Sequence, residues 1–182
     1  MPSRAPERDA GPARPDDTSR SLERAFWRYS LQRWARPEFA QACLSLQEAQ
    51  GADANLLLFC CWMGRRRQRL DRRSLVRARS VVAGWQDCVV QPLRGVRGSL
   101  KRKTALVEAE QADLRRRVAA LELRSEYIEQ LLLARYAWSL PQIAGGAPVL
   151  QIATANLTRY LQLLQAPADI AAEAAAALAA QA

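Results

Sequence analysis

The feature that most restricts how this chain can fold is an uninterrupted apolar run from Leu56 to Met63. A helix over this run has no polar side for water, and a helix that is apolar all round lies in the middle of a fold. The run is much shorter than the roughly 20 residues that cross a bilayer. Gly51 can end the preceding helix, and Asp53 can cap the backbone N–H groups of residues 55 and 56. We therefore expect a central helix over 54–63.

The rest of the chain has helical periodicity and no strand alternation. We predict the all-α class, with a single helical domain over 19–166 built around the central apolar helix. One long helix, from roughly 100 to 138, is expected to lie along it. Residues 1–18 are rich in Pro, Arg, Ala and Asp and are predicted to form a disordered tail. Residues 167–182 are predicted to be an Ala-rich C-terminal tail.

Apolar residues recur at a spacing of seven along the long helix. After Leu100 they are Val107, Leu114, Leu121 and Ile128. This spacing is typical of a helix that packs along a partner helix. The second seam contains polar residues such as Gln111 and Ser125, which disfavours a free-standing coiled coil. The pattern therefore predicts a partner-helix face that meets either another part of the domain or another protein.

The basic residues are concentrated in one segment. The chain has a net charge of +9, but residues 65–103 alone carry +11 and the remainder −2. Such a segment attracts RNA, DNA or an acidic protein. The alternatives are a solvated basic face and a basic face neutralised by the acidic residues elsewhere in the chain. The chain has far more Arg than Lys, a bias that a GC-rich genome could impose without selection for binding. The polyanion-binding candidates are Arg65, Arg66, Arg67, Arg69, Arg72, Arg73, Arg94, Arg97, Lys101, Arg102 and Lys103.

A small polar set lies among apolar residues near the Gly51 turn. Its members are Gln47, Asp53, Asn55 and Arg94. Buried amides and guanidinium groups need hydrogen-bond partners. One interpretation is a structural lock that joins this turn to the segment after Pro92, and the other is a small polar pocket that recognises a ligand anion or a peptide backbone. The acidic residues of the long helix, including Glu122, are interpreted as solubilising its surface.

Several chemistries are disfavoured by composition. The chain has no histidine, which removes Ser-His-Asp and Cys-His nucleophile systems and His-ligated metals. No glycine pattern that cradles a phosphate appears. The four cysteines lack metal-ligand spacing and are expected to be small buried hydrophobes in a reducing compartment. We predict no catalytic residue, no metal and no cofactor.

The first twenty residues contain no apolar signal segment. We therefore expect a cytoplasmic protein without a membrane span.

Five stretches of the chain form a specific pattern. They are Phe26-Trp27, Ala42-Cys43-Leu44-x-Leu46-Gln47, Gly51 to Phe59, Trp85, and Pro92-Leu93-Arg94-x-x-Arg97-x-x-Leu100-Lys101. Together they resemble an uncharacterised proteobacterial family of small all-helical proteins of unknown function. The resemblance covers about Ser21 to Leu133, and it implies no assigned activity, cofactor or catalytic residue.

These observations favour a binding protein over an enzyme. We expect a non-enzymatic intracellular binding or adaptor module that presents a basic face and a long helix to a protein partner. The first alternative is an RNA- or ribonucleoprotein-binding protein that uses segment 65–103. A remote alternative is a helical enzyme acting on an anionic small molecule. The sequence leaves the partner and the oligomeric state open.

Overall fold

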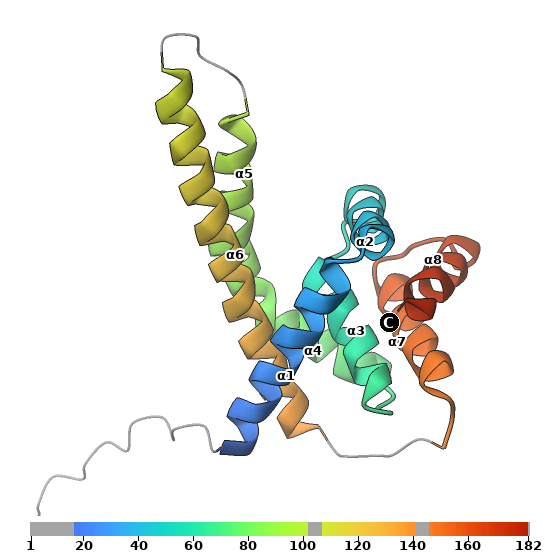
Figure 1. The fold of residues 1–182 in the computed structure, drawn as a ribbon. Coiled ribbons are helices and arrows are strands. Elements are labelled where there is room, and N and C mark those ends of the chain that lie inside the picture. The colour runs from blue at the N-terminus through green and yellow to red at the C-terminus, as the bar shows by residue number, and fades with distance from the viewer. Residues whose placement is uncertain (1–16, 102–106, 141–145, 182) are drawn as a thin grey trace, which may run out of the picture.

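The computed structural model describes residues 17–101, 107–140 and 146–181. The predicted tail lies outside these ranges, except for Asp17 and Thr18, which begin the first helix. All regular structure in the described residues is helical, which confirms the predicted class (Figure 1). The elements are α1 (Asp17–Trp34), α2 (Pro37–Gln50), α3 (Ala54–Arg65), α4 (Arg72–Trp85), η1 (Gln86–Val90), α5 (Gln91–Ser99), α6 (Glu108–Ser139), α7 (Val149–Leu163) and α8 (Ala168–Ala180).

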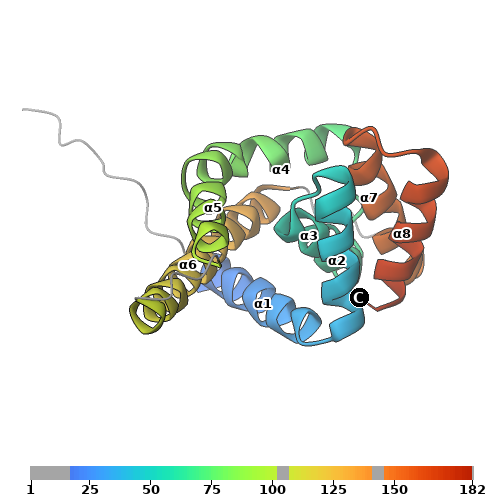
Figure 2. The ribbon, with the colours of Figure 1, turned by 90° about the horizontal axis from the view of Figure 1, so that it is seen from above.

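Helix α3 is the centre of the fold, as its apolar run predicts. Every residue from Ala54 to Gly64 is buried. Figure 2 shows α3 enclosed by α1, α4, α6 and α7, with α8 on the outer side of α7. On the α1 side, Phe26 stacks on Trp62 with ring centroids 4.7 Å apart. The helix thus has neighbours in every direction and no face for solvent.

The turn before α3 has the predicted caps. Gly51 follows α2 in the left-handed conformation, with φ of 62°, which glycine adopts without strain. The Asp53 carboxylate accepts hydrogen bonds from the backbone N–H groups of Asn55 and Leu56, at 2.8 and 3.3 Å. These caps fix the residue at which α3, and with it the buried apolar run, begins.

Pro92 lies inside a continuous helical stretch and does not separate two helices. The chain stays helical from α4 through α5, and the five residues before α5 form a π-helix, η1. Proline has no N–H to donate inside an α-helix, and a wider turn accommodates such a residue. Since a π-helix alters the register, η1 determines which residues of α5 face α6.

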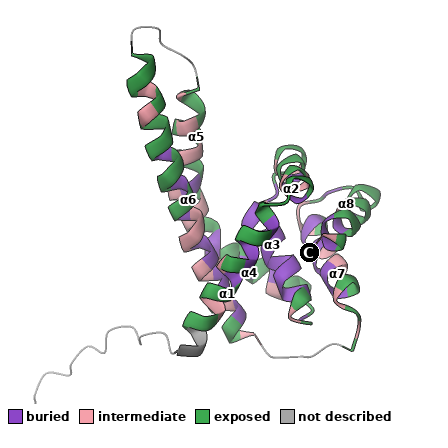
Figure 3. Ribbon diagram, viewed as in Figure 1, coloured by how far each residue is buried: buried purple, intermediate pink, exposed green. Residues whose placement is uncertain are grey.

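Helices α5 and α6 form a hairpin that projects from the body (Figure 1). We call α5 together with residues 107–124 the arm. The long helix starts at Glu108, later than the predicted residue 100, and only its C-terminal half lies beside α3. Figure 3 shows buried residues concentrated in the body, whereas most of the arm is exposed or half-buried. The arm is therefore a feature of the surface rather than of the core.

The C-terminal helices complete the body. Helix α8 lies within the segment predicted to be an Ala-rich tail, and it packs on α7 through Ala171, Ala175 and Leu178, all buried. On α7, the buried Asn156 side chain accepts a hydrogen bond from the Leu70 N–H at 2.8 Å and donates one to the Gln68 carbonyl at 3.0 Å. These bonds tie the connection between α3 and α4 to α7.

Among the described residues, no helix combines the length and the apolar character needed to cross a membrane.

Helices α3 and α7 approach so closely at Gly64 that there is no room for a side chain at this residue. A Cβ atom at residue 64 would lie 2.6 Å from the Cα and Cβ atoms of Ala153, so one helix would have to move. Gly64→Ala should lower the free energy of unfolding by about 1–3 kcal/mol, the usual cost of overpacking, as measured by urea denaturation.

Gly84→Ala is the matched control, because a Cβ there has no neighbour within 4 Å. It should be neutral or stabilise α4 by up to about 1 kcal/mol. Equal unfolding midpoints for the two variants would contradict the packing described here.

Candidate functional site

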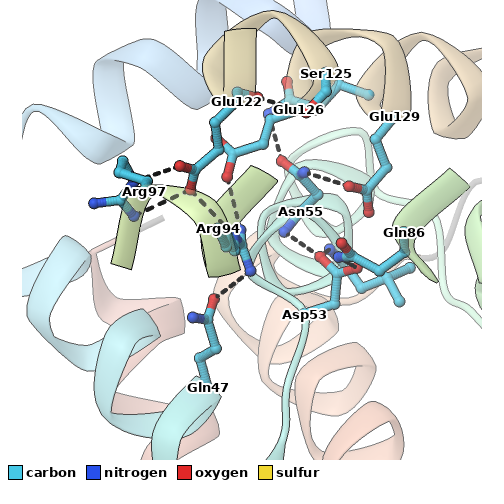
Figure 4. Close-up of polar contacts among 12 residues, drawn as sticks. Gln47, Asp53, Asn55, Gln86, Arg94, Arg97, Glu122, Ser125, Glu126 and Glu129 are labelled. Atoms are coloured by element: carbon cyan, nitrogen blue, oxygen red, sulfur yellow. Dashed lines mark hydrogen bonds and ion pairs between the residues drawn. The ribbon is translucent and has the colours of Figure 1, made fainter. Parts of the chain in front are cut away.

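A polar network lies where the arm joins the body (Figure 4). We call it the arm-base network. Helix α6 supplies three carboxyl groups at helical spacing, Glu122, Glu126 and Glu129, which therefore lie along one side of the helix. Helix α5 supplies two guanidinium groups. The other members are Gln47, Asp53, Asn55, Gln86, Gln130 and Tyr160.

Arg94 connects three elements at the centre of this network. Its guanidinium group contacts Glu126 Oε1 at 2.7 Å and Glu122 Oε1 at 3.4 Å, both on α6. It also donates a hydrogen bond to Gln47 Oε1 on α2 at 3.1 Å. Arg97 donates two hydrogen bonds to the Glu122 carboxylate, which raises the pKa of Arg97. The two arginines thus attach α5 to α6, and Arg94 also attaches α5 to the end of α2.

Asn55 connects α3 to α6 inside the protein. Its side-chain N–H donates to Glu129 Oε2 at 3.0 Å, and its carbonyl oxygen accepts from Gln130 Nε2 at 2.7 Å. The neighbouring Asp53 carboxylate accepts from Gln86 Nε2, while the Asp53 N–H donates to the Tyr160 hydroxyl at 2.8 Å. The start of α3 is therefore held by polar contacts from α6, η1 and α7.

Glu129 is fully buried. Burial raises its pKa to about 10, and the negative charge of Asp53 acts in the same direction. With that pKa, Glu129 is a neutral acid at pH 7. The start of α3 therefore has a neutral carboxylic acid, Glu129, near the Asp53 side chain.

A cavity of about 660 Å³ opens beside the network, within the usual range for small-molecule sites of about 300–1,000 Å³. Its lining includes Gln47, Asp53, Arg94 and Tyr160. Asp53 and Arg94 already have protein partners, so their contacts are explained by structure alone. Within the described residues, no three or more His, Cys, Asp or Glu side chains are grouped so that they could hold a metal ion.

The arginine segment is divided between two parts of the molecule. Arg94 and Arg97 belong to the arm-base network and are engaged by glutamates of α6. Lys101 is exposed at the end of α5, and Arg102 and Lys103 lie outside the described residues. The remaining candidates surround the connection between α3 and α4, where Arg66 lies over the Trp62 ring at 4.9 Å. No salt bridge among the described residues involves Arg65, Arg66, Arg67, Arg69, Arg72 or Arg73.

The partner-helix face is open to solvent over most of its length. Val107, Leu114 and Leu121 are 48%, 50% and 58% exposed, while Ile128, nearer the body, is half-buried. The second seam points inward instead, with Val118 and Ser125 buried. The polar seam is contacted from both ends of the α4–α5 segment: Trp85 Nε1 donates to the Ser125 carbonyl at 2.9 Å, and Gln111 Nε2 donates to the Leu100 carbonyl, directly after α5, at 3.4 Å. The more apolar seam is left uncovered.

Several residues of the network were not identified from the sequence. Glu122 was interpreted as a solubilising residue, which is wrong, because it is buried and bonded to Arg97. Glu122 and Glu126 are four residues apart and Arg94 and Arg97 are three apart, so each pair lies on one face of its helix, and this charge complementarity was the available signal. Nothing local in the sequence identifies Gln86 or Tyr160, because tertiary packing brings them to Asp53.

The buried acid predicts a pH-dependent stability. The folded state keeps the Glu129 proton between about pH 5 and about pH 9, whereas the unfolded state loses it, so stability falls as pH rises, by at most about 1.4 kcal/mol per pH unit. Glu129→Gln keeps a neutral side chain with an acceptor for the Asn55 side-chain N–H. Urea unfolding across this pH range should show a flatter profile for the variant and higher stability at the alkaline end.

Glu126→Gln is the control, because it removes a partner of Arg94 and should leave the pH slope unchanged. Parallel profiles for wild type and Glu129→Gln would contradict a neutral Glu129.

Comparison of the chain with curated proteins and with solved structures finds no match. A family model does match, and it covers residues 25–133, from α1 through α6 to the C-terminal part of the arm-base network. The predicted likeness to a family of unknown function is confirmed at that level. This chain belongs to the family described as "Protein of unknown function (DUF2390)".

Proposed function

We propose that this protein is a non-enzymatic cytoplasmic binding module whose arm docks against a helix of a protein partner. The observation that carries the proposal is the exposure of Leu114 and Leu121 along one side of a projecting helix, together with Val107 at its N-cap. We call these three residues the arm face. A partner helix with its own apolar stripe would remove them from water, which is favourable by about 25 cal/mol for each Å² of apolar surface.

The rest of the arm explains why this face is available for a partner. Helix α5 is attached to an adjacent side of α6 through Arg97 and Glu122, and α1 holds a flank, where Trp27 packs edge-on against Tyr127 with centroids 4.8 Å apart. The arm is therefore supported on two sides. Its leucines are displayed by an ordered helix, which lowers the entropic cost of binding.

Charge along the arm favours one orientation of the partner helix. The first turns of α6 contain Glu110 and Asp113, whereas Arg117 and Arg124 follow toward the body. A partner helix that places basic residues near the tip and acidic residues near the base would complement this order.

The proposal predicts that Leu114→Glu combined with Leu121→Glu abolishes partner binding without unfolding the body, because both side chains are at least half exposed. The chain should be purified from its own cells after nuclease treatment. Proteins held by the wild type and lost from the variant would be identified by mass spectrometry, with circular dichroism as the check on folding.

Leu150→Glu is the matched control, since Leu150 is a similarly exposed leucine, 52% accessible, on α7 away from the arm. Partners that are lost equally from the double variant and from Leu150→Glu, or that the double variant still binds, would contradict binding through the arm face.

Binding of RNA or another polyanion is a second candidate function. It is favoured by the exposed arginines around the connection between α3 and α4. Asp71 is the only acidic residue between Arg65 and Arg79, and its carboxylate caps α4 by accepting a hydrogen bond from the Ser74 N–H. Phosphate contacts by such residues would make binding strongly dependent on salt.

Replacing Arg65, Arg69 and Arg73 with Ala should weaken RNA binding at least tenfold and reduce the slope of log affinity against log salt by up to about three. The control replaces the exposed Arg20, Arg24 and Arg28 of α1, which changes the net charge equally. Fluorescence anisotropy with a single-stranded RNA measures both. An equal loss of RNA affinity in the two triple variants would contradict a specific RNA site at the α3–α4 connection and indicate non-specific charge attraction.

A further inference from the structure

We infer that the helix which covers the arm face is α6 of a second copy of this chain, lying antiparallel, so that two arms form a symmetric dimer. The inference rests on the proposed function, because it uses the same face and names its partner. It follows from the apolar spacing, the charge order and the uncovered surface of α6, taken together.

The apolar residues are self-complementary in an antiparallel register. When Leu114 of one copy lies opposite Leu121 of the other, the two-fold axis creates the same contact a second time. The same alignment brings Val107, the N-cap residue of α6, toward the half-buried Ile128 at both ends. The apolar contacts then extend over about 30 Å, at 1.5 Å per residue.

The charges select this orientation. In the same register Glu110 of each copy and Arg124 of the other lie on the same flank of the seam, one residue from direct opposition, so that two opposite-charge contacts flank the leucines. A parallel pair would instead place Glu110 opposite Glu110 and Arg124 opposite Arg124. Arg124 is held at the base of the arm, where its guanidinium group lies over the Tyr127 ring at 5.0 Å. Like charges opposed across an interface disfavour the parallel alternative.

The residue nearest the two-fold axis is also compatible with pairing. Arg117 would lie close to its own counterpart, which would be repulsive if it were alone. Within each copy, however, Arg117 Nε contacts Asp113 Oδ2 at 2.7 Å, and Arg116 shares the same carboxylate at 2.9 Å from Oδ1. Asp113 therefore offsets part of the positive charge at the centre of the dimer.

The test measures molar mass by sedimentation equilibrium on the full chain. The wild type should be a dimer at tens of micromolar, whereas Leu114→Glu should be a folded monomer and Leu150→Glu a dimer. A wild type that is monomeric at the highest soluble concentration would overturn the inference.

A charge exchange tests the register. Glu110→Arg alone and Arg124→Glu alone should each weaken dimerisation at least tenfold, and the double exchange should restore it to within threefold of wild type. Failure of the double variant to recover would overturn the antiparallel register, since both singles would then act by another route.

The outcomes separate this inference from the proposed function. The wild-type chain could be monomeric while the Leu114→Glu and Leu121→Glu substitutions remove a different protein partner. In that case the dimer is wrong and the arm remains a binding surface. If it is monomeric and these substitutions remove no partner, both are wrong.

Discussion

The structure depends on the burial of α3. Eleven consecutive residues of this helix are withdrawn from solvent, which is possible only if other helices surround it. Helices α1, α4, α6 and α7 do so, and the close approach of Gly64 to Ala153 shows how little space remains on the α7 side. Because the core is complete around α3, the N-terminal half of α6 has no core left to cover. It extends from the body with α5 instead, and this accounts for the arm.

The arm-base network connects that extension to the core. Arg94 attaches α5 to α6 and to the end of α2, while Asn55 attaches α6 to the start of α3. These contacts are more than half-buried, so each polar group needs its partner, and removing one leaves another unsatisfied. A neutral Glu129 avoids a second negative charge beside Asp53. The arm thus has a defined direction relative to the body, which a binding surface made of widely spaced leucines requires.

Local sequence patterns predicted much of this fold, and tertiary pairing accounts for what they did not predict. The apolar run located α3, and Gly51 and Asp53 located its start, because caps depend on residues within one turn. The heptad spacing identified Leu114 and Leu121 as one face, but it could not show that the α4–α5 segment would contact the other seam. The continuous helix through Pro92 was missed because a π-turn depends on how α5 packs against α6. Glu122 was misinterpreted for the same reason, since its burial is created by Arg97 on another helix.

The central claim is that the arm face is the surface through which this protein binds, and that its first occupant is a second copy. Methyl NMR of the leucine side chains, recorded as a function of protein concentration, tests it most directly. The account predicts that the Leu114 and Leu121 methyl signals shift together with rising concentration, while those of Leu150 and the buried Leu57 stay constant. Signals of Leu114 and Leu121 that remain unchanged at every concentration, or that move no more than those of Leu150, would contradict it.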